Sequence, residues 1–337
     1  MTGPDILNRH RDAIEREVGR SLSASDSPID EMRRSYLGWT EEGLPSLAKC
    51  LRPSLCLSAC ESLGGDVQQA LPIAAAVELV HNFSLIHDDI EDGDVVRHHR
   101  PTLWHAYGRA PAIFAGVGLW AIAHQTLDRA RDAGLSTERV LRAHSILNDA
   151  CLEMIEGQHQ DISFEEREDV TLAEYIEMIG RKSGALLGAS LQLGALVAGC
   201  EDEELDRFDT FGRELGLAFQ IRDDVLGIWG EGSATGKPVG ADIAHKKKSL
   251  PVVHAFQQVV GPDHDVLTEA YSKPEMDDSD INEVLSILQR WNCRYFAQGL
   301  AEDHRSRAMS ILSRTPISPD ARRAFDELMS FVLERDY

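Results

Sequence analysis

The sequence predicts an all-α protein built as one large helical bundle, a single domain over residues 1–337. Apolar residues recur at helix-compatible spacings, long strand-like alternation is absent, and Gly and Pro interrupt the pattern where helices would end. The chain has 337 residues, of which 43% are hydrophobic, so it is long enough to bury a large core.

The predicted helices follow one another along the chain. An apolar stripe over 77–86 runs directly into acidic residues, and a second helical pattern covers 141–155. The uncharged stretch 183–200 has the length of a membrane span, but it contains Gln192, and basic residues flank it on its N-terminal side only. We therefore expect a helix buried in the core. The interruptions between helices fall at 64–65, 93, 108–111, 230–240 and 316–319.

Net charge limits the partners of this chain. It has 34 Lys and Arg residues against 56 Asp and Glu residues, which gives a formal charge of −22. This argues against a nucleic-acid or anionic-membrane partner, because both are polyanions. The beginning of the sequence has no apolar signal segment, and the six cysteines form no paired motif. We expect a cytoplasmic protein with no integral membrane segment.

An acidic cluster ends the first apolar stripe, in the order His87-Asp88-Asp89-Ile90-Glu91-Asp92. Asp88 and Asp92 lie four residues apart and share one helix face, and Asp89 lies one step aside. Taken alone, such a cluster in an acidic protein is explained by a solvated helix face.

A second cluster, Phe219-Gln220-Ile221-Arg222-Asp223-Asp224, favours a different interpretation. Gln220 precedes the two aspartates by three and four residues, so an amide and two carboxylates share a face. Two aspartate pairs on apolar helices indicate a site for a hard cation, and oxygen ligands favour Mg²⁺ over zinc. Nearby cations suit the binding and release of a diphosphate. They are Lys49, Arg52, Arg97, Arg100, Lys182, Lys237 and the run 246–248.

At these residues the chain resembles the trans-isoprenyl diphosphate synthase (polyprenyl synthetase) family over nearly its whole length. The family motif DDxxD corresponds to 88–92, and the second aspartate motif corresponds to 219–226. Further segments match in the same order, at Lys49 and Arg52, Gly157, Gln158 and Asp161, 182–185, Lys237, Asp242, Lys247 and Pro251. The resemblance implies the isoprenoid synthase fold, a helical bundle around a deep central cavity, and a homodimer.

The resemblance also implies a reaction and a role for each matching residue. Isopentenyl diphosphate would be joined to an allylic diphosphate whose C–O bond ionises with the help of Mg²⁺, three ions in this family. Asp88, Asp92 and Asp223 would ligate the metal, with Asp89 and Asp224 in support. The allylic diphosphate would contact Arg97, Lys182 and Lys237, and isopentenyl diphosphate would contact Lys49, Arg52 and His81. The other residues expected to contact substrate are His98, Ser183, Gln220 and Lys247.

Several positions depart from the family pattern. The third aspartate of the second motif is Gly227, and a Gly-Asp pair becomes Gly116-Val117. Gly-Lys-Arg becomes Ala48-Lys49-Cys50, and Arg-Arg becomes Arg97-His98. The changes at Cys50 and His98 bear most directly on the affinity for isopentenyl diphosphate.

Two residues before the first motif bear on product length. Phe83 lies five residues before Asp88, where an aromatic ring would act as a floor for the growing tail, and the small Ser84 leaves space beside it. In the family this combination resembles enzymes that make geranylgeranyl diphosphate from farnesyl or shorter primers. Three alternatives remain open: a farnesyl diphosphate synthase, a terpene cyclase of the same fold, and a non-catalytic subunit of a heteromeric prenyl synthase.

Overall fold

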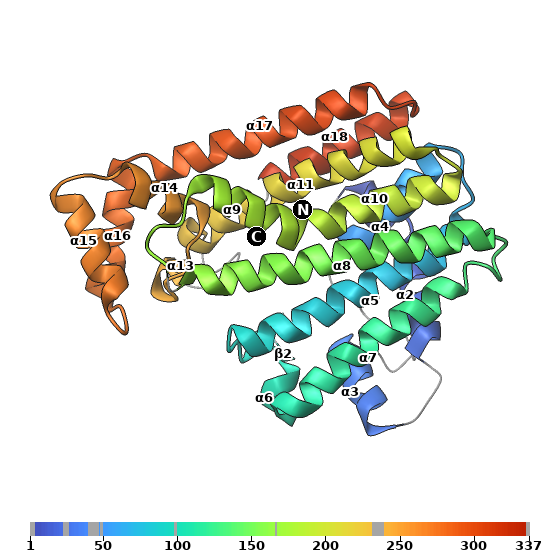
Figure 1. Ribbon diagram of the computed structural model, residues 1–337, viewed down its shortest axis with the longest axis horizontal. Helices are drawn as coiled ribbons and strands as arrows, with labels where there is room; N and C mark the ends of the chain where they lie inside the picture. The colour runs from blue at the N-terminus through green and yellow to red at the C-terminus, as the bar shows by residue number, and fades with distance from the viewer. Residues whose placement is uncertain are drawn as a thin grey trace. The chain divides into compact units, whose positions relative to one another are not determined.

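A computed structural model describes residues 4–22, 27–39, 47, 50–97, 100–165, 167–230 and 239–334. Within these ranges almost all regular structure is helical (Figure 1). The strands form one short antiparallel pair, β1 (Val96–Arg97) with β2 (Arg100–Pro101). The prediction of an all-α fold is confirmed.

The helices form two compact units. Unit 1 contains Met1–Cys151, Leu186–Asp209 and Arg314–Phe325, and unit 2 contains Leu152–Ala185, Thr210–Ser313 and Asp326–Tyr337. The division falls within α8 (Thr137–Glu165), α11 (Asp202–Trp229) and α18 (Pro319–Glu334). The expectation of a single domain over 1–337 stays a prediction.

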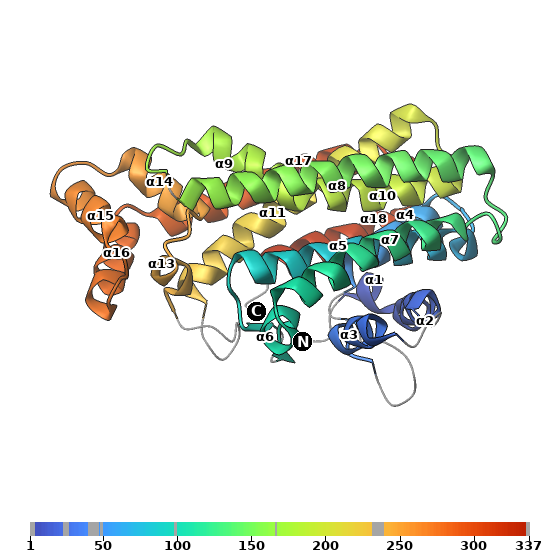
Figure 2. The ribbon, with the colours of Figure 1, turned by 60° about the horizontal axis from the view of Figure 1, so that its bottom comes forward.

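Unit 1 is built around α5 (Val67–Glu91), which packs against α2, α4 and α7; Figures 1 and 2 both show α5 beside α7. The helix begins at Asp66, whose side chain accepts a hydrogen bond from the amide of Gln68 at 2.9 Å. Buried residues lie all around α5, as expected for a helix covered on several sides. The other elements of this unit are α1 (Asp5–Asn8), α2 (Arg11–Leu22), α3 (Pro28–Tyr36), α4 (Leu51–Ser62), α6 (Leu103–Tyr107), α7 (Arg109–Asp128) and most of α10 (Ala185–Ala198).

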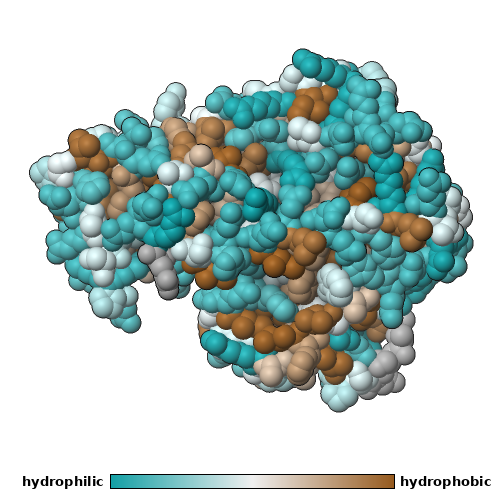
Figure 3. Space-filling model, in the orientation of Figure 1, coloured by the Kyte–Doolittle hydropathy of each residue, from teal (hydrophilic) through white to brown (hydrophobic). Residues whose placement is uncertain are grey.

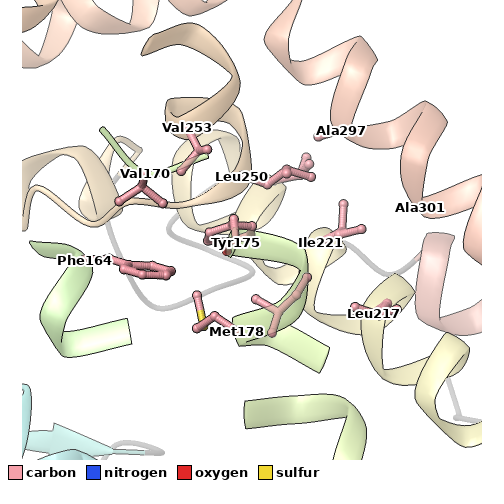
Figure 4. Packing of buried hydrophobic residues seen from close by; sticks show 12 residues of the cluster. Phe164, Val170, Tyr175, Met178, Leu217, Ile221, Leu250, Val253, Ala297 and Ala301 are labelled. Atoms are coloured by element: carbon pink, nitrogen blue, oxygen red, sulfur yellow. The ribbon is translucent and has the colours of Figure 1, made fainter. Parts of the chain in front are cut away.

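Unit 2 has its core where α9 (Leu172–Ile179) meets α11, α14 (Leu250–Gln258) and α17 (Cys293–Ser313). Figure 4 shows Tyr175, Ile221, Leu250 and Ala297 in this cluster. Helix α9 begins with a capping box between Thr171 and Glu174 and continues into a π-helical turn, η1 (Gly180–Gly184). The unit also contains α13 (Ala241–Ala244), α15 (Pro262–Ser272) and α16 (Asp278–Arg290).

Helices α5 and α7 are long and apolar enough to cross a membrane, judged by length and composition alone. Core helices of soluble proteins pass the same test, and 67% of the apolar window of α5 is buried, against 39% for α7. The stretch 183–200, which the sequence singled out, is not among these candidates, and most of its residues are buried. Hydrophobic side chains remain at the surface over α7 and α8 (Figure 3).

A glycine allows α10 to lie directly against α4 in unit 1. A Cβ atom on Gly194 would lie 2.0 Å from the carbonyl oxygen of Cys56, so any side chain here would separate the two helices. Gly299 on α17 offers a matched comparison, because it is exposed and a Cβ atom there would have no neighbour within 4 Å.

We expect Gly194→Ala to lower the free energy of unfolding by about 1–3 kcal/mol, because the clash is with backbone that cannot rotate away. Gly299→Ala should instead raise it by up to about 1 kcal/mol, since alanine favours the helix. Urea unfolding followed by circular dichroism measures both. Equal effects of the two substitutions would contradict the close contact of α10 with α4.

Candidate active site

The end of α5 carries the first aspartate cluster, and its three carboxylates lie in different surroundings. Asp89 is 1% exposed, whereas Asp88 is half-buried and Asp92, at the C-cap, is exposed. Arg97 Nε donates to Asp89 Oδ1 at 2.5 Å, and Asp89 Oδ2 has no hydrogen-bond partner among the described residues. Burial raises the pKa of Asp89 to about 6 against the opposing attraction of Arg97. Asp88 and Asp92 are therefore the more accessible pair.

The sequence did not indicate Tyr36, which belongs to the surroundings of this cluster. Burial, together with the negative charge of Asp89, raises the pKa of the Tyr36 hydroxyl well above its ordinary value. Arg97 acts on it in the opposite direction. The Asp89–Arg97 pair thus lies close to α3 as well as to the β1 strand that carries the arginine.

Two residues predicted to contact isopentenyl diphosphate lie together in unit 1. Arg52, in the first turn of α4, places Nη1 3.1 Å from Nε2 of His81 on α5. Lys49, the third residue predicted for this substrate, lies outside the described residues, as do Ala48 and His98, which is also predicted to contact substrate. Cys50 is buried with a left-handed backbone (φ 48°), and Val117 lies on the exposed side of α7.

Glu78 is a buried carboxylate near this pair that the sequence analysis missed. It is 5% exposed on α5, and burial raises its pKa while the charge of Arg52 lowers it. Asn82 Nδ2 donates to Glu78 Oε1 at 3.1 Å. An acid within an apolar helix, three residues before His81, is the signal that could have identified it.

The two residues predicted to set product length are both half-buried on α5. The Phe83 ring packs edge-on against His87, with centroids 4.8 Å apart. His87 in turn lies against Gly116 of α7, where a Cβ atom would approach the imidazole to 2.7 Å. Ser84 Oγ donates to the carbonyl oxygen of His81 at 2.8 Å. The Phe83 ring thus has a fixed aromatic neighbour one helical turn nearer Asp88, whereas its action as a floor stays a prediction.

The second aspartate cluster, on α11, also divides into two environments. Asp224 is 1% exposed and accepts hydrogen bonds from Tyr175 Oη, from the Leu250 amide at 3.0 Å and from Gln220 Nε2 at 3.2 Å. Burial raises its pKa to about 7, against these hydrogen bonds. Asp223 is half-buried. Ser183 Oγ donates to Gln220 Oε1 at 2.7 Å, so two of the predicted substrate residues join this network.

Lys182 lies in η1 and is paired with Asp161 of α8, with Nζ and Oδ2 2.6 Å apart. Burial tends to raise the pKa of Asp161, but the charges of Lys182 and Lys247 outweigh it and the pKa is lowered. A Cβ atom on Gly157 would lie 2.3 Å from the Lys182 amide nitrogen, so this glycine lets α8 approach η1. Lys237 lies outside the described residues.

The three lysines of the run 246–248 lie in different surroundings. Lys248 is 6% exposed, with its ammonium 4.7 Å from the Phe256 ring centroid and 4.8 Å from that of Tyr271. Lys246 Nζ donates to the Tyr271 carbonyl oxygen at 3.3 Å. Lys247 is the member whose charge acts on Asp161 and Asp224.

The departure at Gly227 has a structural explanation within unit 2. A Cβ atom there would lie 2.0 Å from Oδ2 of Asp242, so the carboxylate of Asp242 fills the space beside this glycine. Within the described part of the chain, no three His, Cys, Asp or Glu side chains form a group that could hold a metal. The donors available at the clusters are carboxylate oxygens, which suit Mg²⁺.

Comparison with known proteins gives consistent matches. The family model described as polyprenyl synthetase matches residues 40–288. The short chain isoprenyl diphosphate synthase of Methanothermobacter thermautotrophicus is 36% identical over 99% of this chain and 98% of its own length. The (2E,6E)-farnesyl diphosphate synthase of Mycobacterium bovis is 35% identical over 89% of this chain and 84% of its own. The geranylgeranyl pyrophosphate synthetase structure from Pyrococcus horikoshii superposes with a TM-score of 0.88 at 34% identity, covering 98% of this chain and 97% of its own.

The space beside Gly227 leads to a test. We expect Gly227→Asp, which restores the missing motif aspartate, to lower the free energy of unfolding by about 1–3 kcal/mol, because the new side chain collides with Asp242 and adds like charge. Gly299→Asp on exposed α17 is the control and should change stability by about 0.5 kcal/mol or less. Thermal unfolding compares them, and a Gly227→Asp protein as stable as the parent would contradict the placement of Asp242.

Proposed function

Because the chain belongs to the polyprenyl synthetase family, we propose that it is a prenyltransferase that joins isopentenyl diphosphate to an allylic diphosphate. One observation carries the proposal: in both aspartate clusters one carboxylate is buried and hydrogen-bonded, while neighbouring carboxylates are more accessible. A cation that binds a diphosphate needs carboxylate oxygens that face solvent. Each cluster has such a carboxylate next to one that is buried and held by hydrogen bonds.

The accessible carboxylates match the requirements of Mg²⁺. This ion takes oxygen ligands, often one or two carboxylates together with waters and substrate phosphates. Asp88, Asp92 and Asp223 would hold it, and we extend the proposal to three ions. Bound Mg²⁺ supplies Lewis-acid neutralisation of the leaving diphosphate, so that the allylic C–O bond can ionise.

The side chains of this chain would bind and orient the two diphosphates. Lys182, whose ammonium pairs with the carboxylate of Asp161, would bind diphosphate oxygens in place of that carboxylate. Lys247 adds positive charge in the same surroundings. Arg97 and Lys237 complete the donors that we propose for the allylic substrate.

The pair Arg52–His81 supports a second diphosphate site and therefore favours a transferase over a terpene cyclase. Its two side chains come from different helices and lie 3.1 Å apart, which presents a guanidinium and an imidazole together. A cyclase ionises one allylic diphosphate and needs no second diphosphate. We propose that Lys49 and His98 extend this second site.

For the product we propose geranylgeranyl diphosphate. The support is Phe83. Its ring contacts the ring of His87, and His87 lies against Gly116 of α7. A ring held in this way resists displacement by added methylene groups, at a cost of about 1–3 kcal/mol.

We also propose a homodimer in the cytoplasm. Helix α7 exposes Ile113, Phe114, Val117 and Trp120, with Phe114 64% exposed. An apolar helix face of this kind fits burial against a second copy. All six cysteines are free, as in proteins of reducing compartments.

A product assay tests the proposed reaction. The full chain is incubated with Mg²⁺, labelled isopentenyl diphosphate and, in separate reactions, dimethylallyl, geranyl or farnesyl diphosphate, and the products are separated by chromatography. We expect a longer prenyl diphosphate, and no product after Mg²⁺ is chelated. A hydrocarbon from the allylic substrate alone would indicate a cyclase, and no product with any primer would indicate a non-catalytic subunit.

Substitutions at the first cluster test whether activity depends on a particular ligand carboxylate or only on the negative charge of the cluster. Asp88→Asn should lower kcat by about 100-fold or more, because a charge that stabilises the ionising state is lost. Glu91→Gln removes the same charge on the same helix end and should leave kcat within about twofold. Equal losses in the two variants would mean that only the net charge of the cluster matters.

The proposed product length depends on the Phe83 ring. We expect Phe83→Ala to shift the products to longer chains, because the floor is removed, and Ser84→Phe to shift them to shorter chains, because a ring is added beside it. Chromatography of the dephosphorylated products measures both shifts. If both variants keep the parent distribution, the floor lies elsewhere in the chain.

A further inference from the structure

Tyr175 is a buried phenol that neither the sequence motifs nor the proposed reaction accounts for. It lies on α9, is 2% exposed, and donates its hydroxyl hydrogen to Oδ2 of Asp224 on α11. Most buried hydroxyls have a hydrogen-bond partner, and a buried carboxylate without hydrogen bonds is costly. The pair therefore satisfies a need on both sides.

Asp224 differs from its neighbour Asp223 in burial: Asp224 is buried and its two oxygens accept hydrogen bonds from the protein, whereas Asp223 is half-buried. Oδ2 accepts from Tyr175 and from the Leu250 amide, and Oδ1 accepts from Gln220. With 1% of its surface exposed, Asp224 is poorly placed to reach a cation bound to substrate. Its role is to hold elements together.

The elements joined by Asp224 are those that carry the proposed diphosphate contacts of unit 2. Asp224 follows Asp223 on α11, and Leu250 is the first residue of α14, three residues after Lys247. Tyr175 precedes η1, which contains Lys182. One carboxylate thus fixes three segments by hydrogen bonds.

The stretch 175–183 is tied to this carboxylate at both of its ends. Tyr175 bonds to Asp224 directly, and Ser183 bonds to it through Gln220. The π-helical turn with Lys182 lies between these two attachments. Such turns are less favourable than regular α-helix and persist where the surroundings hold them.

We infer that Tyr175 is a positioning residue of the proposed diphosphate site, acting through Asp224, which is itself a positioning residue and not a metal ligand. The inference rests on the proposed prenyl transfer for its kinetic consequence. Loss of the Tyr175 hydroxyl removes one of the two hydrogen-bonded links between the stretch 175–183 and Asp224, so Lys182 and the start of α14 become less well held.

The test compares two tyrosines in the full chain. Tyr175→Phe removes the bonded hydroxyl, whereas Tyr271→Phe removes a hydroxyl that is buried without a hydrogen-bond partner among the described residues. We expect Tyr175→Phe to lower kcat about tenfold, with KM for both substrates within about twofold. Hydrogen exchange at the Leu250 amide should speed up about tenfold. Tyr271→Phe should match the parent in all three measurements, and a Tyr175→Phe protein that does the same overturns the inference.

A second pair of variants tests Asp224 and does not depend on Tyr175→Phe folding. Asn at 224 can still accept from Tyr175 and Leu250, and a flipped Gln220 can accept from its amide. Calorimetric titration with Mg²⁺ and inorganic diphosphate should therefore show Asp224→Asn within about threefold of the parent and Asp223→Asn weaker by at least about tenfold. Equal weakening overturns the assignment of Asp224 as a positioning residue.

The two proposals fail in different ways. If the parent chain transfers no prenyl group, the proposed reaction is wrong, whereas exchange at Leu250 still tests the link from Tyr175 and diphosphate binding still tests the role of Asp224. If the parent is active and Tyr175→Phe changes neither kcat nor exchange, the reaction stands and the positioning role is wrong.

Discussion

A buried carboxylate, Asp224, is the group on which the order of unit 2 depends. Moving a carboxylate out of water is costly unless hydrogen bonds replace those lost, and three donors from three segments do so here. The same bonds that offset the cost of burial also fix α9, α11 and α14 relative to one another. The η1 turn and Lys182 take their position from that arrangement.

Unit 1 also contains a buried aspartate whose burial is offset by a bonding partner, which here is a charged group. Asp89 is as buried as Asp224, but it is held by the guanidinium of Arg97 from the β1 strand. In both clusters burial raises the pKa of the inner aspartate while the neighbour remains more exposed. Each of the two aspartate clusters therefore contains one buried, hydrogen-bonded carboxylate and at least one that is more accessible.

Glycines decide how closely the site segments approach. Gly157 brings α8 within backbone contact of Lys182, and Gly227 leaves room for the carboxylate of Asp242. A Cβ atom at Gly157 would meet the backbone of Lys182, and a Cβ atom at Gly227 would meet the carboxylate of Asp242. These contacts explain why a departure from a family motif, such as Gly227, need not leave a space empty: a residue from another segment occupies it.

The sequence alone determined the all-α fold, the two aspartate clusters and the family, because helical periodicity and short motifs are local properties of the chain. It also indicated that Arg52 and His81 belong together. The resemblance assigned Asp223 as a metal ligand and Asp224 as a supporting residue, but the sequence could not show what Asp224 bonds to. It also could not identify Tyr175, Glu78 and Tyr36, because their roles depend on neighbours far away in sequence. Burial and hydrogen-bond partners are set when distant segments pack, so only the tertiary structure decided which acidic groups hold the fold and which remain accessible to substrate.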